Sequence, residues 1–151
     1  MADNCPVEIL LIEDNPHDVE LTLHALRKRH LANSIHVARD GAEALDYLFC
    51  AGAYADRNAN ENPKVILLDY KLPKVSGMEV LRRIRADPRT HSIPIVVLTA
   101  SPEERDRIES YELGANSYIV KPVDFAQFTQ VVEKLGLYWL LINQPAKPKT
   151  K

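Results

Sequence analysis

The sequence predicts an α/β fold in which a parallel β-sheet is covered by helices on both faces. Short apolar runs, such as residues 65–68 (Val-Ile-Leu-Leu), are typical of fully buried strands. Segments of ten or more residues with apolar side chains at helical spacing lie between these runs. Strands that alternate with helices of this length are joined by right-handed crossovers, which produce a parallel sheet.

The first half of the chain is expected to form two strand–helix units. A buried strand over residues 7–12 is followed by a helix that Asn15-Pro16 opens and that runs to about Arg29. A short strand near residues 35–37 leads to the Asp40-Gly41 cap of a second helix. The polar stretch 51–63 is predicted to be a long surface loop. Inner faces are assigned to Val19, Leu23 and Leu26, and then to Ala42, Leu45, Leu48 and Phe49.

The second half repeats the pattern three times. A strand ends at Asp69, and a helix that carries Val80, Leu81 and Ile84 inward ends at Asp87-Pro88. The next strand covers residues 93–98, and its helix begins at Pro102 and is expected to close at residues 113–115. The last strand covers residues 117–120, and Asp124 caps a helix. The inner face of this helix is assigned to Phe125, Phe128, Val131, Val132 and Leu135.

Length and composition are those of one ordinary globular domain. The net charge of −2 gives no electrostatic basis for binding nucleic acid. Cys5 and Cys50 form no C-x-x-C pair, and no signal peptide or membrane-spanning run occurs. We therefore expect a cytoplasmic protein with no nucleic-acid or membrane partner. Residues 1–143 would form a single domain with an extended C-terminal helix, and residues 144–151 a disordered tail.

Polar residues follow the predicted strands at the point where each strand ends. Glu13 and Asp14 end the first strand, Asp69 the third, Thr99 the fourth and Lys121 the fifth. The carboxyl ends of parallel strands meet at one edge of the sheet, where such folds place their ligands. Three carboxylates at that edge would repel one another, and a site made only of oxygen ligands suits Mg²⁺.

Each of these residues has an ordinary explanation when it is taken alone. An Asp after a strand is often a helix cap, Thr99 could be a turn residue, and Lys121 could be a surface cation. Their occurrence at successive strand ends of one α/β chain favours a common site.

Five segments resemble the response-regulator receiver domains of two-component signalling. They are residues 10–15 (Leu-Leu-Ile-Glu-Asp-Asn), residues 67–73 (Leu-Leu-Asp-Tyr-Lys-Leu-Pro), Gly77, residues 98–100 (Leu-Thr-Ala) and Lys121-Pro122. The resemblance extends over about residues 7–135. It implies a doubly wound, flavodoxin-like receiver fold with five strands in the order 2-1-3-4-5 and five helices.

The resemblance also implies a role for each site residue. Asp69 would be the phosphoacceptor, which takes a phosphoryl group from the phosphohistidine of a sensor histidine kinase. Asp14, Asp69 and the main-chain carbonyl of Lys71 would hold Mg²⁺, and Glu13 would act through a water. Lys121 and the Thr99 hydroxyl would contact phosphoryl oxygens. Such a protein is not an enzyme, although it catalyses its own phosphotransfer and autodephosphorylation.

Two further expectations follow from family positions. Tyr118 occupies the aromatic switch position, where it would move into space that Thr99 vacates on phosphorylation. The alternative is that Tyr118 is simply a half-buried strand residue. Lys71 and Ser101 stand where family side chains flank the path of the hydrolytic water, and a cation at Lys71 predicts slow autodephosphorylation.

The C-terminal segment predicts self-association. Residues 137–142 (Leu-Tyr-Trp-Leu-Leu-Ile) are apolar on every side, so something must cover them. Packing onto the chain's own domain is one option. The option we favour is a homodimer, with the interface assigned to Phe125, Leu137, Tyr138, Trp139 and Leu141. This extension and the long loop resemble stand-alone regulators of cyanobacterial-type bacteriophytochromes, which makes a phytochrome the candidate kinase.

Other α/β classes fit less well. A haloacid-dehalogenase-type phosphatase needs a second Asp where this chain has Lys71, and a Rossmann oxidoreductase needs G-x-G-x-x-G. The main alternative is a non-phosphorylated receiver-like adaptor that acts by protein binding. Intact Asp69, Thr99 and Lys121 argue against the adaptor, and the output would be protein contact or phosphorelay.

Overall fold

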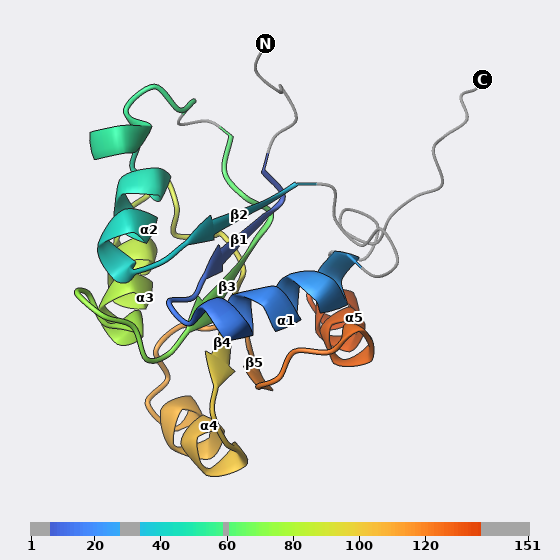
Figure 1. The fold of residues 1–151 in the computed structure, drawn as a ribbon. Coiled ribbons are helices and arrows are strands. Elements are labelled where there is room, and N and C mark those ends of the chain that lie inside the picture. The colour runs from blue at the N-terminus through green and yellow to red at the C-terminus, as the bar shows by residue number, and fades with distance from the viewer. Residues whose placement is uncertain (1–6, 28–33, 59–60, 137–151) are drawn as a thin grey trace.

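The computed structural model describes residues 7–27, 34–58 and 61–136. Its centre is a five-stranded parallel sheet with the order β2-β1-β3-β4-β5 (Figure 1). The fold class and the strand order predicted from the sequence are therefore confirmed. The strands are β1 (Ile9–Ile12), β2 (Ile35–Ala38), β3 (Val65–Asp69), β4 (Ile95–Thr99) and β5 (Ser117–Val120).

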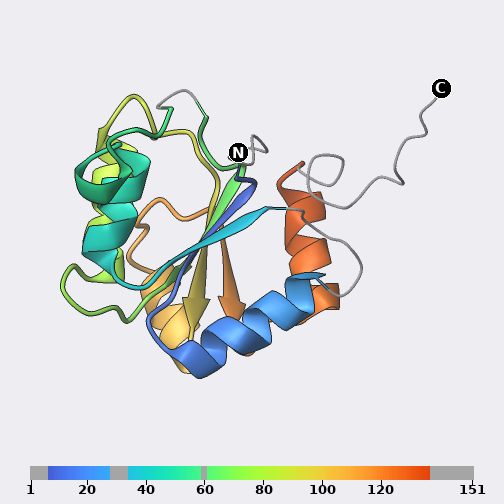
Figure 2. The same cartoon turned by 45° about the horizontal axis from the view of Figure 1, so that its top comes forward.

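Helices cover both faces of this sheet, as Figures 1 and 2 show. Helices α1 (Pro16–Arg27) and α5 (Phe125–Lys134) pack on one face, and α2 (Gly41–Leu48) and α3 (Gly77–Ala86) pack on the other. Helix α4 (Pro102–Glu109) contacts β4 and β5. Among the described residues, no helix has both the length and the apolar character needed to cross a bilayer.

The two apolar cores follow from the alternation of side chains along buried strands. In the central strand, Val65 and Leu67 belong to the core under α1 and α5, whereas Ile66 and Leu68 belong to the core under α2 and α3. Successive side chains of a strand point to opposite faces, so a strand covered on both faces must be apolar throughout. This is why β3 carries no polar residue before Asp69, the last residue of the strand.

Several predicted features of the helices are confirmed. Asp40 and Asp124 are N-caps, and each accepts a 2.7 Å hydrogen bond, from the N–H of Glu43 and of Gln127 respectively. Pro102 begins α4. The expected inner residues of α3 are buried, and in α5 Phe125 and Leu135 pack at the edge of the core rather than inside it.

The long surface loop predicted over residues 51–63 contains one helical turn that the sequence analysis did not predict. A 3-10 helix, η1 (Gly52–Tyr54), begins this segment. Its Tyr54 hydroxyl donates to Glu43 Oε2 at 2.7 Å, and its ring stands edge-on against Tyr47. This hydrogen bond and this ring contact hold the 3-10 helix against α2. In α2 the inner position assigned to Ala42 belongs to Ala44, since Ala42 is only half-buried.

The predicted end of α4 was also wrong, because the helix ends at Glu109 and not at residues 113–115. The chain turns back through positive φ angles at Glu112 and Gly114. Arg85 of α3 holds this turn, since its Nε donates to the Gly114 carbonyl at 2.9 Å. The first and fourth strands each begin two residues later than expected, and the predicted end of the first helix at Arg29 lies outside the described residues.

Candidate functional site

Three of the predicted site residues converge at the carboxyl edge of the sheet. Glu13 and Asp14 follow β1, and Asp69 ends the neighbouring β3. One oxygen from each carboxylate lies within 4.8 Å of the other two. Glu13 and Asp69 are buried, whereas Asp14 is exposed, so the group opens to solvent on the Asp14 side.

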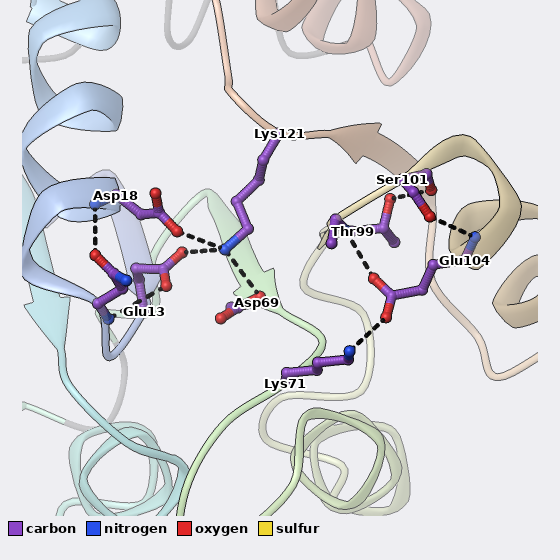
Figure 3. Close-up of polar contacts among 10 residues, drawn as sticks. Glu13, Asp18, Asp69, Lys71, Thr99, Ser101, Glu104 and Lys121 are labelled. Carbon is purple, nitrogen blue, oxygen red and sulfur yellow. Dashed lines mark hydrogen bonds and ion pairs between the residues drawn. The ribbon is translucent and has the colours of Figure 1, made fainter.

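Lys121 brings its ammonium into this acidic group. Nζ lies 2.9 Å from Asp18 Oδ2, 3.1 Å from Glu13 Oε1 and 3.3 Å from Asp69 Oδ1 (Figure 3). Burial lowers the pKa of Lys121, but the three carboxylates outweigh it and raise the pKa above its ordinary value. Lys121 therefore stays charged, and it lies where it can neutralise an anion bound to Asp69.

Asp18 is a member of this group that the sequence analysis missed. It lies in the first turn of α1, and its backbone N–H donates to Asn15 Oδ1 at 3.1 Å. Its carboxylate is the closest partner of Lys121. An acidic residue in the first turn of the helix that follows Glu13-Asp14 is the signal that could have revealed it.

Burial shifts the pKa of both inner carboxyls upward. Burial and, second, the charge of Asp69 raise the pKa of Glu13 to about 7, against the opposing charge of Lys121. Burial likewise raises the pKa of Asp69, against the opposing effects of Lys121, Glu13 and the backbone N–H of Lys71, which donates to Asp69. The site therefore favours any added positive charge.

The segment between β3 and α3 closes against the carboxyl end of β3. Ser76 caps α3, with its hydroxyl accepting from the N–H of Glu79 at 3.2 Å. A Cβ added at Gly77 would lie 2.6 Å from the carbonyl oxygens of Asp69 and Tyr70, so only glycine permits this approach. An open pocket of about 570 Å³ lies beside it. The pocket is lined by Asp14, Tyr70, Lys71, Leu72, Pro73, Ser76 and Met78.

The side chains of Thr99 and Lys71 lie near the acidic group but bond elsewhere. Thr99 is fully buried at the end of β4, and its hydroxyl donates to the Ser101 carbonyl at 3.4 Å. Lys71 Nζ lies 3.6 Å from Glu104 Oε2 of α4 (Figure 3). Glu104 is a second residue that the sequence analysis did not identify, because its partner lies far away in the chain.

The remaining predicted residues divide into two groups. Tyr118 is half-buried beside the core under α2 and α3. Tyr118 pairs in register with Val97, so these two side chains point to the same face of the sheet. Thr99 is two residues beyond Val97 on the same strand, and Tyr118 and Thr99 therefore also share that face. Phe125 is partly buried against its own core. The other residues assigned to a dimer interface, Leu137, Tyr138, Trp139 and Leu141, lie outside the described residues.

The donor set fits a hard divalent cation. Carboxylate oxygens are the ligands that Mg²⁺ prefers, and Glu13, Asp14 and Asp69 offer three without a competing nitrogen or sulfur. With Asp18 added, the group contains four carboxyl groups and one ammonium, which contacts three of them, so negative charge remains to be neutralised. The arrangement can hold a cation, and it places the buried Asp69 carboxylate beside it.

Comparison with protein families and curated proteins gives a consistent result. The family model of the response regulator receiver domain matches residues 9–133. The chain is 38% identical over 143 residues to the probable methanogenesis regulatory protein FilR2 of Methanothrix harundinacea, covering 95% of this chain and 90% of FilR2. It is 37% identical over 137 residues to response regulator Rcp1 of Synechocystis sp., covering 91% of each.

Solved structures agree with this result. The bacteriophytochrome response regulator AtBRR superposes with a TM-score of 0.84 at 52% identity, covering 93% of this chain and 99% of AtBRR. The phosphorylated cyanobacterial phytochrome response regulator RcpA superposes at 0.70 with 40% identity, covering 90% of this chain and 95% of RcpA. The Mn²⁺-bound form of Rcp1 superposes at 0.69 with 37% identity, covering 93% of this chain and all of Rcp1.

The raised pKa of Glu13 predicts that cation binding depends on pH. A carboxyl with a pKa of about 7 must lose its proton before a cation binds, so affinity should rise with pH and binding should release a proton. Between pH 6 and pH 8 we expect the affinity for Mg²⁺ to increase about tenfold. Titration calorimetry across this range measures the change. Glu13→Gln should flatten the pH dependence, and a wild-type affinity that is constant from pH 6 to pH 8 would refute the prediction.

Proposed function

Because this chain belongs to the response regulator receiver domain family, we propose that it accepts a phosphoryl group on Asp69 from a sensor histidine kinase. One observation carries the proposal. The buried carboxylate of Asp69 lies at the end of the central strand, within 3.3 Å of the Lys121 ammonium and beside Glu13 and Asp14. A nucleophile, a cation for the transferred group and a cation-binding set of oxygens thus occupy one place.

In the proposed reaction an Asp69 oxygen attacks the phosphorus of a phosphohistidine. The P–O bond to Asp69 forms as the P–N bond breaks, and the leaving imidazole nitrogen takes a proton from water. Little else is needed than positioning and neutralisation of charge around a loose transition state. Lys121 is positioned by Asp18 and Glu13 to neutralise a phosphoryl oxygen. The Thr99 hydroxyl would leave the Ser101 carbonyl, a weak partner at 3.4 Å, to donate to another oxygen.

We assign the divalent cation to Asp14, Asp69 and the main-chain carbonyl of Lys71, with Glu13 acting through a water. When bound, Mg²⁺ would neutralise charge on the carboxylates and on the incoming phosphoryl group. The convergence of the three carboxylates supports this assignment, and the related Rcp1 has a Mn²⁺-bound form.

We propose a phytochrome as the cognate kinase. The relatives described above differ in the process for which they are named, since FilR2 is named for methanogenesis and AtBRR for a bacteriophytochrome. Identity to AtBRR is 52%, against 38% to FilR2, and this difference favours the phytochrome. The surface available for a partner includes the pocket beside Asp14.

Phosphorylation of the purified chain tests the central proposal. With acetyl phosphate and Mg²⁺, intact-mass spectrometry should show one added phosphoryl group on the wild type and none on Asp69→Asn, because the amide is not a nucleophile for phosphorus. Asp106→Asn is a matched control, since Asp106 is an exposed carboxylate of α4, 71% accessible, and should be labelled like the wild type. A wild type that stays unlabelled by small-molecule donors and by a phosphorylated kinase would favour the adaptor alternative.

We also propose that Tyr118 turns inward on phosphorylation, into space that Thr99 vacates when it moves toward the phosphoryl group. Their common face of the sheet supports this, as does the half-buried position of the Tyr118 ring. In a complex with Mg²⁺ and beryllium fluoride, a phosphoryl analogue, a crystal structure should show Tyr118 turned inward and less exposed. Thr99→Ala should uncouple the two, leaving Tyr118 in its resting position. An unchanged Tyr118 rotamer in the wild-type complex would contradict the switch.

Finally, we propose a homodimer through Phe125 and the segment that carries Leu137, Tyr138, Trp139 and Leu141. The apolar character of residues 137–142 supports it. Light scattering at increasing concentration should give twice the mass of one chain, and Trp139→Ala should shift the mass toward one chain. Leu21→Ala removes a 42% exposed apolar residue of α1 and should not change the mass. A monomer at high concentration would rule the dimer out.

A further inference from the structure

Glu104 contacts two segments of the site, the residue after Thr99 and the loop after β3. It lies in the first turn of α4 and is only 6% exposed. Its Oε1 accepts from the backbone N–H of Ala100 at 2.7 Å, and its Oε2 lies 3.6 Å from Lys71 Nζ (Figure 3). Ala100 directly follows Thr99, and Lys71 is two residues beyond Asp69.

Part of this arrangement is ordinary helix capping. The Glu104 N–H donates to Ser101 Oγ at 3.1 Å, which with the Ala100 contact makes a reciprocal cap of the kind that often begins helices. Helix α2 begins in the same way, with Glu43 accepting from the Arg39 N–H at 2.9 Å. Capping does not account for the contact with Lys71, which belongs to the loop after β3.

Lys71 lies between Glu104 and Asp69, and the contact with Glu104 therefore bears on the site. The backbone N–H of Lys71 donates to the Asp69 carboxylate, so its backbone lies against Asp69. Its side chain pairs with Glu104 instead. A phosphoryl group on Asp69 would bring about −2 charge next to Lys71, against the single charge of Glu104. Lys71 would then have two anions within reach of one flexible side chain.

We propose that Glu104 is a positioning residue that holds the Lys71 ammonium away from phosphorylated Asp69 and thereby shortens the life of the phosphoryl group. This inference rests on the proposed phosphorylation of Asp69. Lys71 is the partner that moves, because its side chain is 73% exposed whereas Glu104 is buried and held by Ala100. An ion pair with one exposed lysine at 3.6 Å is weak enough to exchange.

The affected step is hydrolysis of the acyl phosphate. A water oxygen attacks phosphorus, the P–O bond to Asp69 breaks, and the Asp69 carboxylate leaves. The proton of the water passes to solvent, and inorganic phosphate is released. A Lys71 ammonium that contacts the phosphoryl oxygens blocks the approach of water to the phosphorus. When Lys71 is paired with Glu104, water can therefore reach the phosphorus. The more often this ion pair is formed, the faster the acyl phosphate is hydrolysed.

Glu104→Gln tests the proposal, since it keeps an acceptor for the Ala100 N–H and removes the charge that attracts Lys71 and also Arg107 of α4, whose Nη2 lies 3.9 Å from Glu104 Oε2. After acetyl phosphate is removed, phosphorylated protein should persist about two- to fivefold longer than wild type, the range expected for loss of one exposed ion pair. Intact-mass spectrometry over time measures the decay. Glu43→Gln is the matched control, because it removes the corresponding charge from the cap of α2 and should leave the decay unchanged.

A double-variant comparison separates positioning from a general effect on folding. Lys71→Ala should decay faster than wild type, and Lys71→Ala combined with Glu104→Gln should decay at the rate of Lys71→Ala alone. If Glu104→Gln changes the decay equally with and without Lys71, Glu104 acts through the α4 cap and the proposal is overturned. Should Glu104→Gln not fold, the exposed Lys71→Ala variant still decides, because unchanged decay refutes the inference. Normal labelling with unaltered decay overturns this inference alone, whereas an unlabelled wild type overturns the phosphoacceptor assignment itself.

Discussion

One ammonium group holds together carboxylates that would otherwise repel one another. Lys121 Nζ lies within 3.3 Å of oxygens of Asp18, Glu13 and Asp69. Two like charges about 4 Å apart at an effective dielectric near 20 repel by about 4 kcal/mol, a large fraction of the stability of a whole domain. A single cation does not balance four carboxylates, and burial raises the pKa of the inner two, Glu13 and Asp69. The resting site is therefore ready for further positive charge, which links cation binding to everything that happens at Asp69.

The fold creates this concentration of charge by burying its three inner strands, β1, β3 and β4, on both faces. A polar side chain has no place inside such a strand, so the first polar position is the strand end, and parallel direction brings all of these ends to one edge. Asp69 stands at the end of the central strand with Leu98 of β4 beside it in register. The close approach at Gly77 then folds the β3–α3 segment against the acceptor, and Lys71 extends from that segment toward α4. Asp69 and Thr99 are thus the last residues of their strands and Lys121 directly follows β5, whereas Lys71, whose side chain we propose to exchange partners, is on a loop.

Sequence reasoning succeeded where local pattern and topology agree. The strands, the inner face of α3, the caps Asp40 and Asp124, and the convergence of Glu13, Asp14, Asp69 and Lys121 could all be predicted, because strand ends of a parallel sheet must be neighbours. It failed where a long-range contact decides. Tyr54 anchors η1 through Glu43 and Tyr47, and Arg85 holds the turn after α4 through Gly114. In both cases the contacting residues belong to separate elements, and a helix or strand pattern does not reveal contacts between elements.

By itself the sequence determined the architecture and the acidic residues that meet at one edge of the sheet, since apolar periodicity sets the elements and their order places these residues there. The tertiary structure alone decided which partners those groups have. It placed Asp18 on Lys121 and Glu104 on Lys71, and it left the Thr99 hydroxyl on the Ser101 carbonyl. The physical reason is that an ion pair depends on the distance between two side chains to within about an ångström. That distance is set by how separate helices and loops pack, and no local pattern of residues records it.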